Sequence, residues 1–450
     1  MLNQNIPTEL GTERIGKLLG QYAIPAIVAM IAASLYNLVD SIFIGHGVGA
    51  LAISGLSITF PFMNIAAAFG SLVGVGAGTL ISVRLGQKDY ATAQSILGNV
   101  VVLNVFIGLV FTIISLIFID PILYFFGASE NTIGYARDYM VIILLGNVVT
   151  HLYFGLNNVL RAAGHPRKAM MLTINTVILN TVLDPIFIFG FKWGIQGAAI
   201  ATVIAQIVSL VWQNSMFRDK RELLHFTKGI YKPNMRIIRD MLSIGLSPFL
   251  MNVASCIIVM LINNGLKRYS GDLAIGAFGI INRLSFMFLL IVMGLNQGMQ
   301  PIAGYNYGAR LYDRVEEVLK KTIFVATIIT TSAFVIGEFF PELASRAFTS
   351  DEELIALSVY GMRINVMLFP LIGAQIVIAN FFQSIDMSGK AIFLSLIRQV
   401  IVLIPCLIIL PKFYGVTGVW VSMPVSDLAA CIVSTVMIIH QFRKFKKETI

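Results

Sequence analysis

The chain has 450 residues, of which 57% are hydrophobic and only 12% are charged, and its mean hydropathy is +0.83. A soluble domain carries about 25% charged residues, so this composition excludes an ordinary globular protein and predicts a membrane protein. The net charge of +9 would suit nucleic acid, but the basic residues lie between apolar segments, where they indicate topology instead. No nucleic-acid partner is expected.

Twelve apolar segments follow one another along the chain, each long enough to supply the roughly 20 helical residues that cross a bilayer. The polar amino-terminal residues carry no apolar stretch with a cleavage site, so no removable signal peptide is expected. The sequence predicts an all-α integral membrane protein with twelve transmembrane helices. These predicted spans 1–12 lie near residues 17–44, 50–82, 96–119, 136–160, 168–190, 197–217, 237–263, 274–303, 318–340, 355–383, 391–411 and 417–441.

Lysine and arginine are distributed unevenly over the connections. The amino terminus, the even-numbered connections and the carboxyl tail hold 23 of the 32, whereas the odd-numbered connections hold six and three lie within spans. Cytoplasmic loops carry the excess of basic residues in membrane proteins. Both termini of this multi-pass protein are therefore predicted to be cytoplasmic.

The second half of the chain repeats the first at an offset of 222 residues. Leu51-Ala52-Ile53 recurs as Leu273-Ala274-Ile275, Gly86 matches Gly308, and Lys168-Ala169 matches Lys390-Ala391. Each copy holds six spans and enters the membrane from the same side, which predicts two lobes related by pseudo-two-fold symmetry. The predicted parts are an amino-terminal lobe (1–217), a cytoplasmic linker (218–236) and a carboxyl-terminal lobe (237–450). Duplicated lobes favour an alternating-access transporter over a channel or an anchor.

Two acids lie inside the first lobe. A charge at mid-bilayer costs at least about 2.5–3.5 kcal/mol, so such residues usually face a cavity and have a function. Asp184 lies 16 residues after Lys168, or about 24 Å into span 5. Pro185 follows it and cannot donate to the carbonyl of Thr181, which weakens the helix beside the acid. Asp40 lies near the outer end of span 1.

Polar residues at the same depth predict one pocket, formed by Tyr36, Asn37, Asp40, Asn180, Asp184 and Thr202. Two carboxylates in a low-dielectric pocket cannot both stay ionised at low cost. The pair is expected to take up H⁺, or Na⁺ bound by Asp40, Asn180, Asp184 and Thr202. The alternatives are a solvated Asp40 at the end of its span and a structural Asp184 that holds the kink with Asn180.

A third acid, Asp427, lies in span 12. Arg283 in span 8 and Arg363 in span 10 lie at a similar depth, so an ion pair with either is predicted within the second lobe. A structural pair is the first interpretation, and a gating or substrate-facing role is the second. His151 in span 4 is interpreted as a residue bonded to a neighbouring helix, with a proton relay as the alternative.

Several motifs resemble the multidrug and toxic compound extrusion (MATE) family, and more narrowly its DinF-like bacterial branch. They are GLNQGMQPIAGYNYGA (294–309), GVGAGTLISVRLGQKDY (74–90), LRAAGHPRKAM (160–170) and LNTVLDPIFIFG (179–190). The resemblance extends over essentially the whole chain.

The resemblance implies two six-helix bundles in a bacterial cytoplasmic (inner) membrane that export organic compounds against inward H⁺ or Na⁺. Asp40 and Asp184 match the coupling acids of the DinF-like branch, and the residues that match its supporting positions are Tyr36, Asn180 and Thr202. The NorM-like branch relies on acids in spans 7 and 10, where this chain offers no carboxylate, only Asn263, Gln375 and Asn380. Some relatives carry a glutamate at the position of Asn157.

A substrate cavity is expected to use polar and deformable apolar side chains. The candidates are Asn157, Met287, Met293, Gln297, Phe62 and Met63. Ordinary helix packing or lipid contact is the alternative for each apolar one.

Together these features predict a cation-coupled antiporter that exports cationic or amphipathic organic compounds, with no enzymatic activity and no cofactor apart from the coupling ion. Its expected partners are the small-molecule substrate and membrane lipids, and a monomer is expected. A lipid-linked oligosaccharide flippase of the same superfamily is the nearest rival, although only Arg283, Arg363 and Arg398 lie within spans to bind pyrophosphate. A membrane enzyme using the two carboxylates is the more distant rival. The sequence leaves open the choice between H⁺ and Na⁺ and the identity of the substrate.

Overall fold

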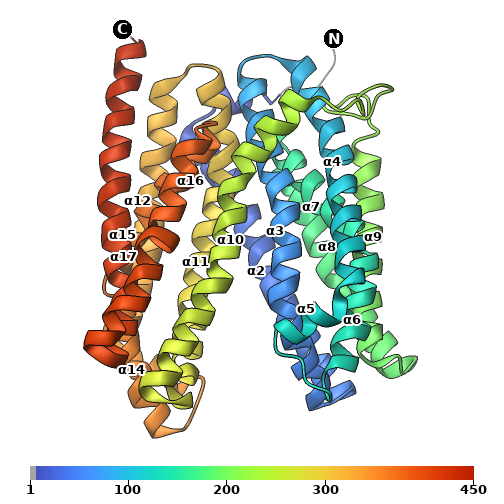
Figure 1. Cartoon of the computed structure of the whole chain (residues 1–450). Coiled ribbons are helices and arrows are strands. Elements are labelled where there is room, and N and C mark those ends of the chain that lie inside the picture. The colour runs from blue at the N-terminus through green and yellow to red at the C-terminus, as the bar shows by residue number, and fades with distance from the viewer. Residues whose placement is uncertain (1–6, 450) are drawn as a thin grey trace. The chain divides into compact units, whose positions relative to one another are not determined.

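The computed structural model describes residues 7–449 and is built of long helices (Figure 1). The first half contains α1 (Glu9–Thr12), α2 (Ile15–Gly47), α3 (Ala50–Gly86), α4 (Tyr90–Ile117), α5 (Ile119–Phe125), α6 (Ile133–Leu145), α7 (Asn147–Ala162), α8 (Pro166–Pro185), the π-helical η1 (Ile186–Gly190) and α9 (Gly194–Met216). The second half contains α10 (Met235–Ser270), α11 (Asp272–Gly308), α12 (Tyr312–Phe339), α13 (Pro341–Arg346), α14 (Glu352–Val366), α15 (Phe369–Ser384), α16 (Ser388–Leu396), the π-helical η2 (Ile397–Leu403) and α17 (Ile404–Thr449).

Within residues 7–449, nine helical segments are long and apolar enough to cross a membrane, and two bent pairs, if each is counted as one span, raise the number to eleven. The bent pairs are α6 with α7, at 54°, and α14 with α15, at 52°. They coincide with predicted spans 4 and 10, which are equivalent in the repeat. The last segment, Ser388–Lys447, contains a break at Gly415, whose φ of 57° is left-handed. This break separates predicted spans 11 and 12, so the twelve-helix prediction agrees with the structure.

The described chain forms two compact units. The first contains residues 7–12 and Val28–Phe249, and the second contains Glu13–Ile27 and residues 250–449. The unit boundaries therefore fall inside helices α2 and α10, close to Pro25 and Pro248. The segment 218–236, expected to be a linker, packs with the first unit.

Specific contacts hold this segment on the first unit. The side chain of Gln94 donates to the carbonyl of His225 and accepts from its N–H, and Asn99 Oδ1 accepts from the N–H of Asn234 at 2.9 Å. A Cβ on Gly98 would lie 2.0 Å from the carbonyl oxygen of Ile230. Only glycine permits this approach of the segment to α4.

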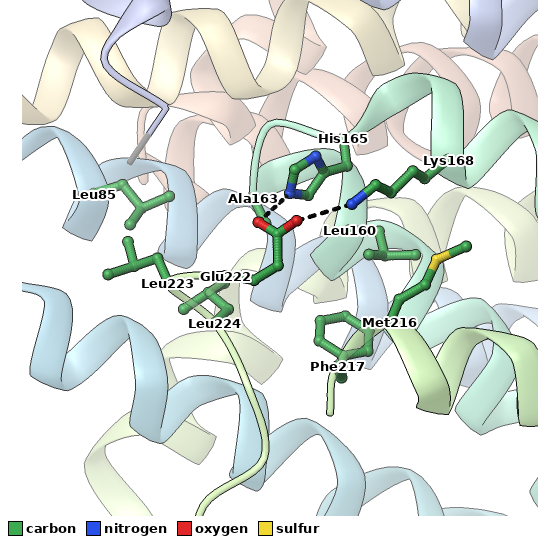
Figure 2. A pocket seen from close by; sticks show the side chains of 10 residues that line it. All are labelled: Leu85, Leu160, Ala163, His165, Lys168, Met216, Phe217, Glu222, Leu223 and Leu224. Atoms are coloured by element: carbon green, nitrogen blue, oxygen red, sulfur yellow. Dashed lines mark hydrogen bonds and ion pairs between the residues drawn. The ribbon is translucent and has the colours of Figure 1, made fainter. Parts of the chain in front are cut away.

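Glu222 lies at the centre of a small pocket of about 10 Å³ between the segment and α8 (Figure 2). Its carboxylate accepts from Lys168 Nζ at 2.9 Å and contacts His165 Nε2 at 2.8 Å. Burial opposes ionisation, but the hydrogen bond from Lys168 and the contacts with His165 outweigh it and lower the pKa of Glu222. Leu223 and Leu224 are buried beside it, so the segment is anchored by both charge and apolar contact.

An apolar cluster fixes the helices that carry the acids. It includes Ile44 of α2, Ile188 of η1 and Ala198 of α9, with Leu56 of α3 and Tyr139 of α6. Residues four apart on a helix lie on one face. Ile44 and Ile188 lie one turn after Asp40 and Asp184, so their burial orients both acids toward the interior of the first unit.

Candidate ion-coupling site

Three helices bring the predicted polar pocket together. Tyr36 and Asp40 come from α2, Asn180 and Asp184 from α8, and Thr202 from α9. The hydroxyls of Tyr36 and Thr202 are 3.0 Å apart. Asn180 Nδ2 donates to Asp184 Oδ1 at 3.2 Å and to Thr202 Oγ1 at 3.2 Å. Residues separated by 166 positions in the sequence thus share one hydrogen-bonded group.

The pocket contains more acceptors than donors. Asp40 is 5% exposed, Asp184 is fully buried and Asn180 is 1% exposed. One oxygen of each, namely Asp40 Oδ1, Asp184 Oδ2 and Asn180 Oδ1, has no hydrogen-bond partner in the described part of the chain. Leaving a buried acceptor unsatisfied costs about 1–3 kcal/mol, and more when it is charged. Protons on the carboxyl groups or an oxygen-seeking cation would satisfy these atoms.

The residues that form the pocket in the structure differ from the predicted set at two positions. Asn37 is exposed, and its Nδ2 donates to the carbonyl of Ala33 in its own helix at 3.1 Å. Tyr139 of α6, which was not predicted, is 1% exposed and interacts with Thr202, Asp40 and Asp184. The depth of Tyr139, near the outer end of span 4, was the sequence signal that would have revealed it.

The helix changes its hydrogen bonding directly after the acid. Helix α8 ends at Pro185, and η1 begins at the next residue. The N–H of Phe191 donates to the carbonyl of Ile186 at 2.9 Å, a spacing of five residues. Short π-helical segments are frequent at functional sites. Pro185 lacks the N–H of a regular turn, which explains why the irregular segment starts beside Asp184.

In the second unit, Asp427 forms an ion pair with a different arginine from those predicted. Arg398 Nε of η2 lies 2.7 Å from Asp427 Oδ1, and the two side chains are 21% and 6% exposed. Arg283 and Arg363 are exposed, so the prediction that one of them pairs with Asp427 is wrong. Arg283 and Arg363 were predicted to lie at a depth similar to that of Asp427, but depth alone does not tell which side of a helix faces a neighbour.

Of four residues predicted to line a substrate cavity, Asn157 and Phe62 are buried, whereas Met287 and Met293 are exposed. Asn157 is bonded on both sides: its Nδ2 donates to the Ala169 carbonyl at 3.1 Å and its Oδ1 accepts from Arg161 at 3.2 Å. Phe62 is buried and stacks on Phe111 with a centroid distance of 5.4 Å. Met287 and Met293 are 61% and 40% exposed. Asn157 and Phe62 thus contribute to packing in the first unit.

The remaining candidates and His151 have partners within their own unit. Met63 packs against the apolar cluster described above and against a second cluster formed by Phe62, Met140 and Leu144. Gln297 is half-buried and has an interaction of its own. His151 is fully buried, and its Nε2 lies 3.0 Å from the carbonyl oxygen of Ala66 on α3. The interpretation of His151 as a residue bonded to a neighbouring helix is therefore confirmed.

Comparison with known proteins identifies relatives over 95% of the chain. The multidrug export protein MepA of Staphylococcus haemolyticus (strain JCSC1435) is 29% identical over 432 residues, covering 95% of this chain and 94% of that protein. MepA of Staphylococcus aureus (strain NCTC 8325 / PS 47) is 28% identical over 430 residues, with the same coverage.

Solved structures agree with these matches. The MATE multidrug transporter DinF-BH, solved in complex with the dye rhodamine 6G, is 36% identical with a TM-score of 0.90, covering 97% of this chain and 98% of that chain. An outward-facing multidrug resistance MATE family transporter of the MOP superfamily, at 23% identity, shares the fold with a TM-score of 0.92, covering 98% of this chain and 99% of that chain. The MatE family model matches residues 25–186 and 244–408. The chain therefore belongs to the MATE family of membrane transporters and is not an enzyme.

Proposed function

We propose that this protein is a cation-coupled antiporter that exports cationic or amphipathic organic compounds from the cytoplasm by alternating access. The observation that carries the proposal is the group of buried oxygens without partners, in the described part of the chain, on Asp40, Asn180 and Asp184. Buried acids that can be neutralised and ionised again are suited to bind and release a cation in each cycle. H⁺ and Na⁺ are the candidate coupling ions, and either is transported rather than retained.

Coupling requires that the ion and the substrate bias the same conformational equilibrium in opposite directions. Neutralisation of Asp40 and Asp184 removes their mutual repulsion and the cost of burying charge. The cluster joins α2, α8 and α9, and the π-helical segment begins beside Asp184. Uptake of the ion would therefore change the packing of these helices in the state that releases substrate outward.

The relatives support a small organic substrate. MepA proteins are named multidrug export proteins, and DinF-BH has been solved with the rhodamine dye. DinF-BH is 36% identical to this chain, so the same dye is the first substrate to test. A bacterial cytoplasmic membrane, cytoplasmic termini and a monomeric state complete the proposal.

The test measures efflux of the rhodamine dye from proteoliposomes in which a pH gradient and a Na⁺ gradient are imposed separately. We expect one gradient to drive efflux and Asp184→Asn to abolish it, because the amide cannot exchange a proton or a charge. Asp120→Asn is the matched control: Asp120 is a half-buried acid paired with Arg137 outside the acid cluster, and its loss is expected to leave the efflux rate unchanged.

Gradient-driven efflux that persists in Asp184→Asn would contradict coupling at this site. A wild-type protein that moves no dye under either gradient would contradict drug export and favour the flippase. Substrate turnover without a gradient would be the result expected of an enzyme.

A further inference from the structure

Separate layers of hydrogen-bonded polar side chains follow the acid cluster toward the predicted cytoplasmic end of the first unit. On α9 the polar residues lie at 202, 206, 209 and 213, and on α8 at 173, 176 and 180. Spacings of three and four residues place each set on one face of its helix. We call the following set the polar seam: Thr150, Tyr153, Thr173, Asn175, Thr176, Gln206, Ser209 and Gln213.

The seam side chains contact one another in successive layers between α7, α8 and α9. Below Thr202, Thr150 donates to Gln206 Oε1. One turn further, Thr176 donates to Ser209 Oγ at 2.7 Å, and Asn175 donates to the same oxygen at 3.2 Å.

The next layer joins all three helices. Tyr153 donates to Thr173 Oγ1 at 3.3 Å, and Gln213 Nε2 donates to the carbonyl of Tyr153 at 3.5 Å. From Asp184 to Thr173 the layers extend over about 16 Å of helix. The seam thus covers the inner part of the first unit, beyond the reach of the acid cluster itself.

The seam has the groups that a proton relay needs. A hydroxyl both donates and accepts, so it can take a proton on its oxygen and release its own. The hydroxyl of Thr176 has two acceptors within reach, Ser209 Oγ at 2.7 Å and the carbonyl of Leu172 at 2.9 Å. Thr202 likewise contacts Tyr36 and the carbonyl of Ala198.

Successive layers are about 5–6 Å apart, so one bridging water is needed between them. Asn180 Oδ1 and Gln213 Oε1 are buried acceptors without a hydrogen-bond partner in the described residues. Buried polar atoms of this kind are the usual partners of internal water. Asn180 belongs to the acid cluster and Gln213 to the layer of Tyr153 and Thr173, so water bound at these two atoms would join the seam to the acids and to its last layer.

The same geometry does not suit a sodium ion. The seam side chains contact one another at hydrogen-bond distances, which leaves no shell of free oxygens around a metal ion in this described region.

We propose that the polar seam is the route by which the coupling proton leaves Asp40 and Asp184 toward the cytoplasm. This inference rests on the proposed function and selects H⁺ as the ion. In each transfer the carboxyl group loses its proton and becomes a carboxylate. Each hydroxyl or water along the seam accepts one proton and passes on another, so one proton emerges and only O–H bonds change.

The test combines Thr176→Val with Ser209→Ala, which removes the hydroxyls of one layer and leaves the acid cluster intact. In proteoliposomes with an internal pH dye and an imposed pH gradient, we expect proton release coupled to transport of the rhodamine dye to slow by about tenfold or more. Binding of the rhodamine dye to the purified protein should stay within about twofold, because no seam residue contacts the substrate in this mechanism.

The matched control is Thr330→Val with Ser358→Ala in the second unit, where both hydroxyls are buried and donate to carbonyls of their own helices. It is expected to release protons at the wild-type rate. Thr176→Ser keeps a hydroxyl and should restore most of the rate. If the double variant does not fold, Thr176→Val against Thr176→Ser provides the same comparison.

A wild-type rate of proton release in the Thr176→Val, Ser209→Ala variant would overturn the seam as the route. The proposed function would still stand if Asp184→Asn abolished coupling in the same assay. Efflux driven by Na⁺ alone, without proton movement, would also overturn the seam and leave the antiporter intact. Coupling retained in Asp184→Asn would overturn the proposed function itself.

Discussion

Asp184 and Asp427 are both buried carboxylates, but their surroundings predict losses of stability of different size for the same substitution. One oxygen of Asp184 has no partner among the described residues, and the other accepts from the amide of Asn180. Asp427 accepts from the guanidinium of Arg398 at 2.7 Å. The first acid is bonded to a neutral group, whereas the second belongs to an ion pair.

We therefore expect Asp427→Asn to destabilise the protein by about 3–5 kcal/mol, because it leaves Arg398 partly buried without its counter-charge. Asp184→Asn should cost less than about 1 kcal/mol, because an amide keeps the bond with Asn180 and adds no buried charge. Thermal unfolding in detergent compares the two. Equal losses of stability would contradict the structural role of the Asp427–Arg398 pair.

At the scale of elements, helix α4 and the segment 218–236 depend on each other. Gly98 allows the backbone at Ile230 to lie against α4, and Gln94 binds His225 through both amide atoms. A segment rich in lysine and arginine would otherwise be open to trypsin. The resistance of this segment to trypsin therefore measures how firmly the segment is held against α4.

Gly98→Ala is expected to loosen this docking at a cost of about 1–3 kcal/mol, because the added Cβ overlaps a backbone oxygen that cannot move alone. Trypsin should then cut within 218–236 faster than in the wild type. Gly134→Ala is the control, since a Cβ there meets nothing within 4 Å. Unchanged proteolysis of Gly98→Ala would show that the segment does not depend on this approach.

At the scale of the whole molecule, the basic residues predict the orientation in the membrane. The excess of lysine and arginine on one set of connections is expected to place both termini in the cytoplasm. A protease-cleavable tag at the carboxyl terminus should be removed in inverted vesicles and protected in right-side-out vesicles. Cleavage in right-side-out vesicles would contradict the predicted orientation and, with it, the proposed direction of export.

More of the fold than of the candidate site could be predicted from the sequence. Hydropathy and the repeat predicted the twelve spans, because lipid contact requires long apolar helices. Depth and helical spacing were sufficient to predict that one pocket contains Tyr36, Asp40, Asn180, Asp184 and Thr202. They failed for Asn37, which binds its own helix, and for the arginine that pairs with Asp427.

The membrane class, the duplication and the acids of the candidate site could all be read from the sequence, since these follow from composition, spacing and the cost of burying charge. Only the folded chain revealed that Tyr139 joins the acids, that Arg398 pairs with Asp427 and that three helices share a polar seam. These features depend on the rotation of each helix about its axis and on side-chain contacts between distant segments. Interhelical packing fixes both, and a hydropathy pattern along one helix records neither.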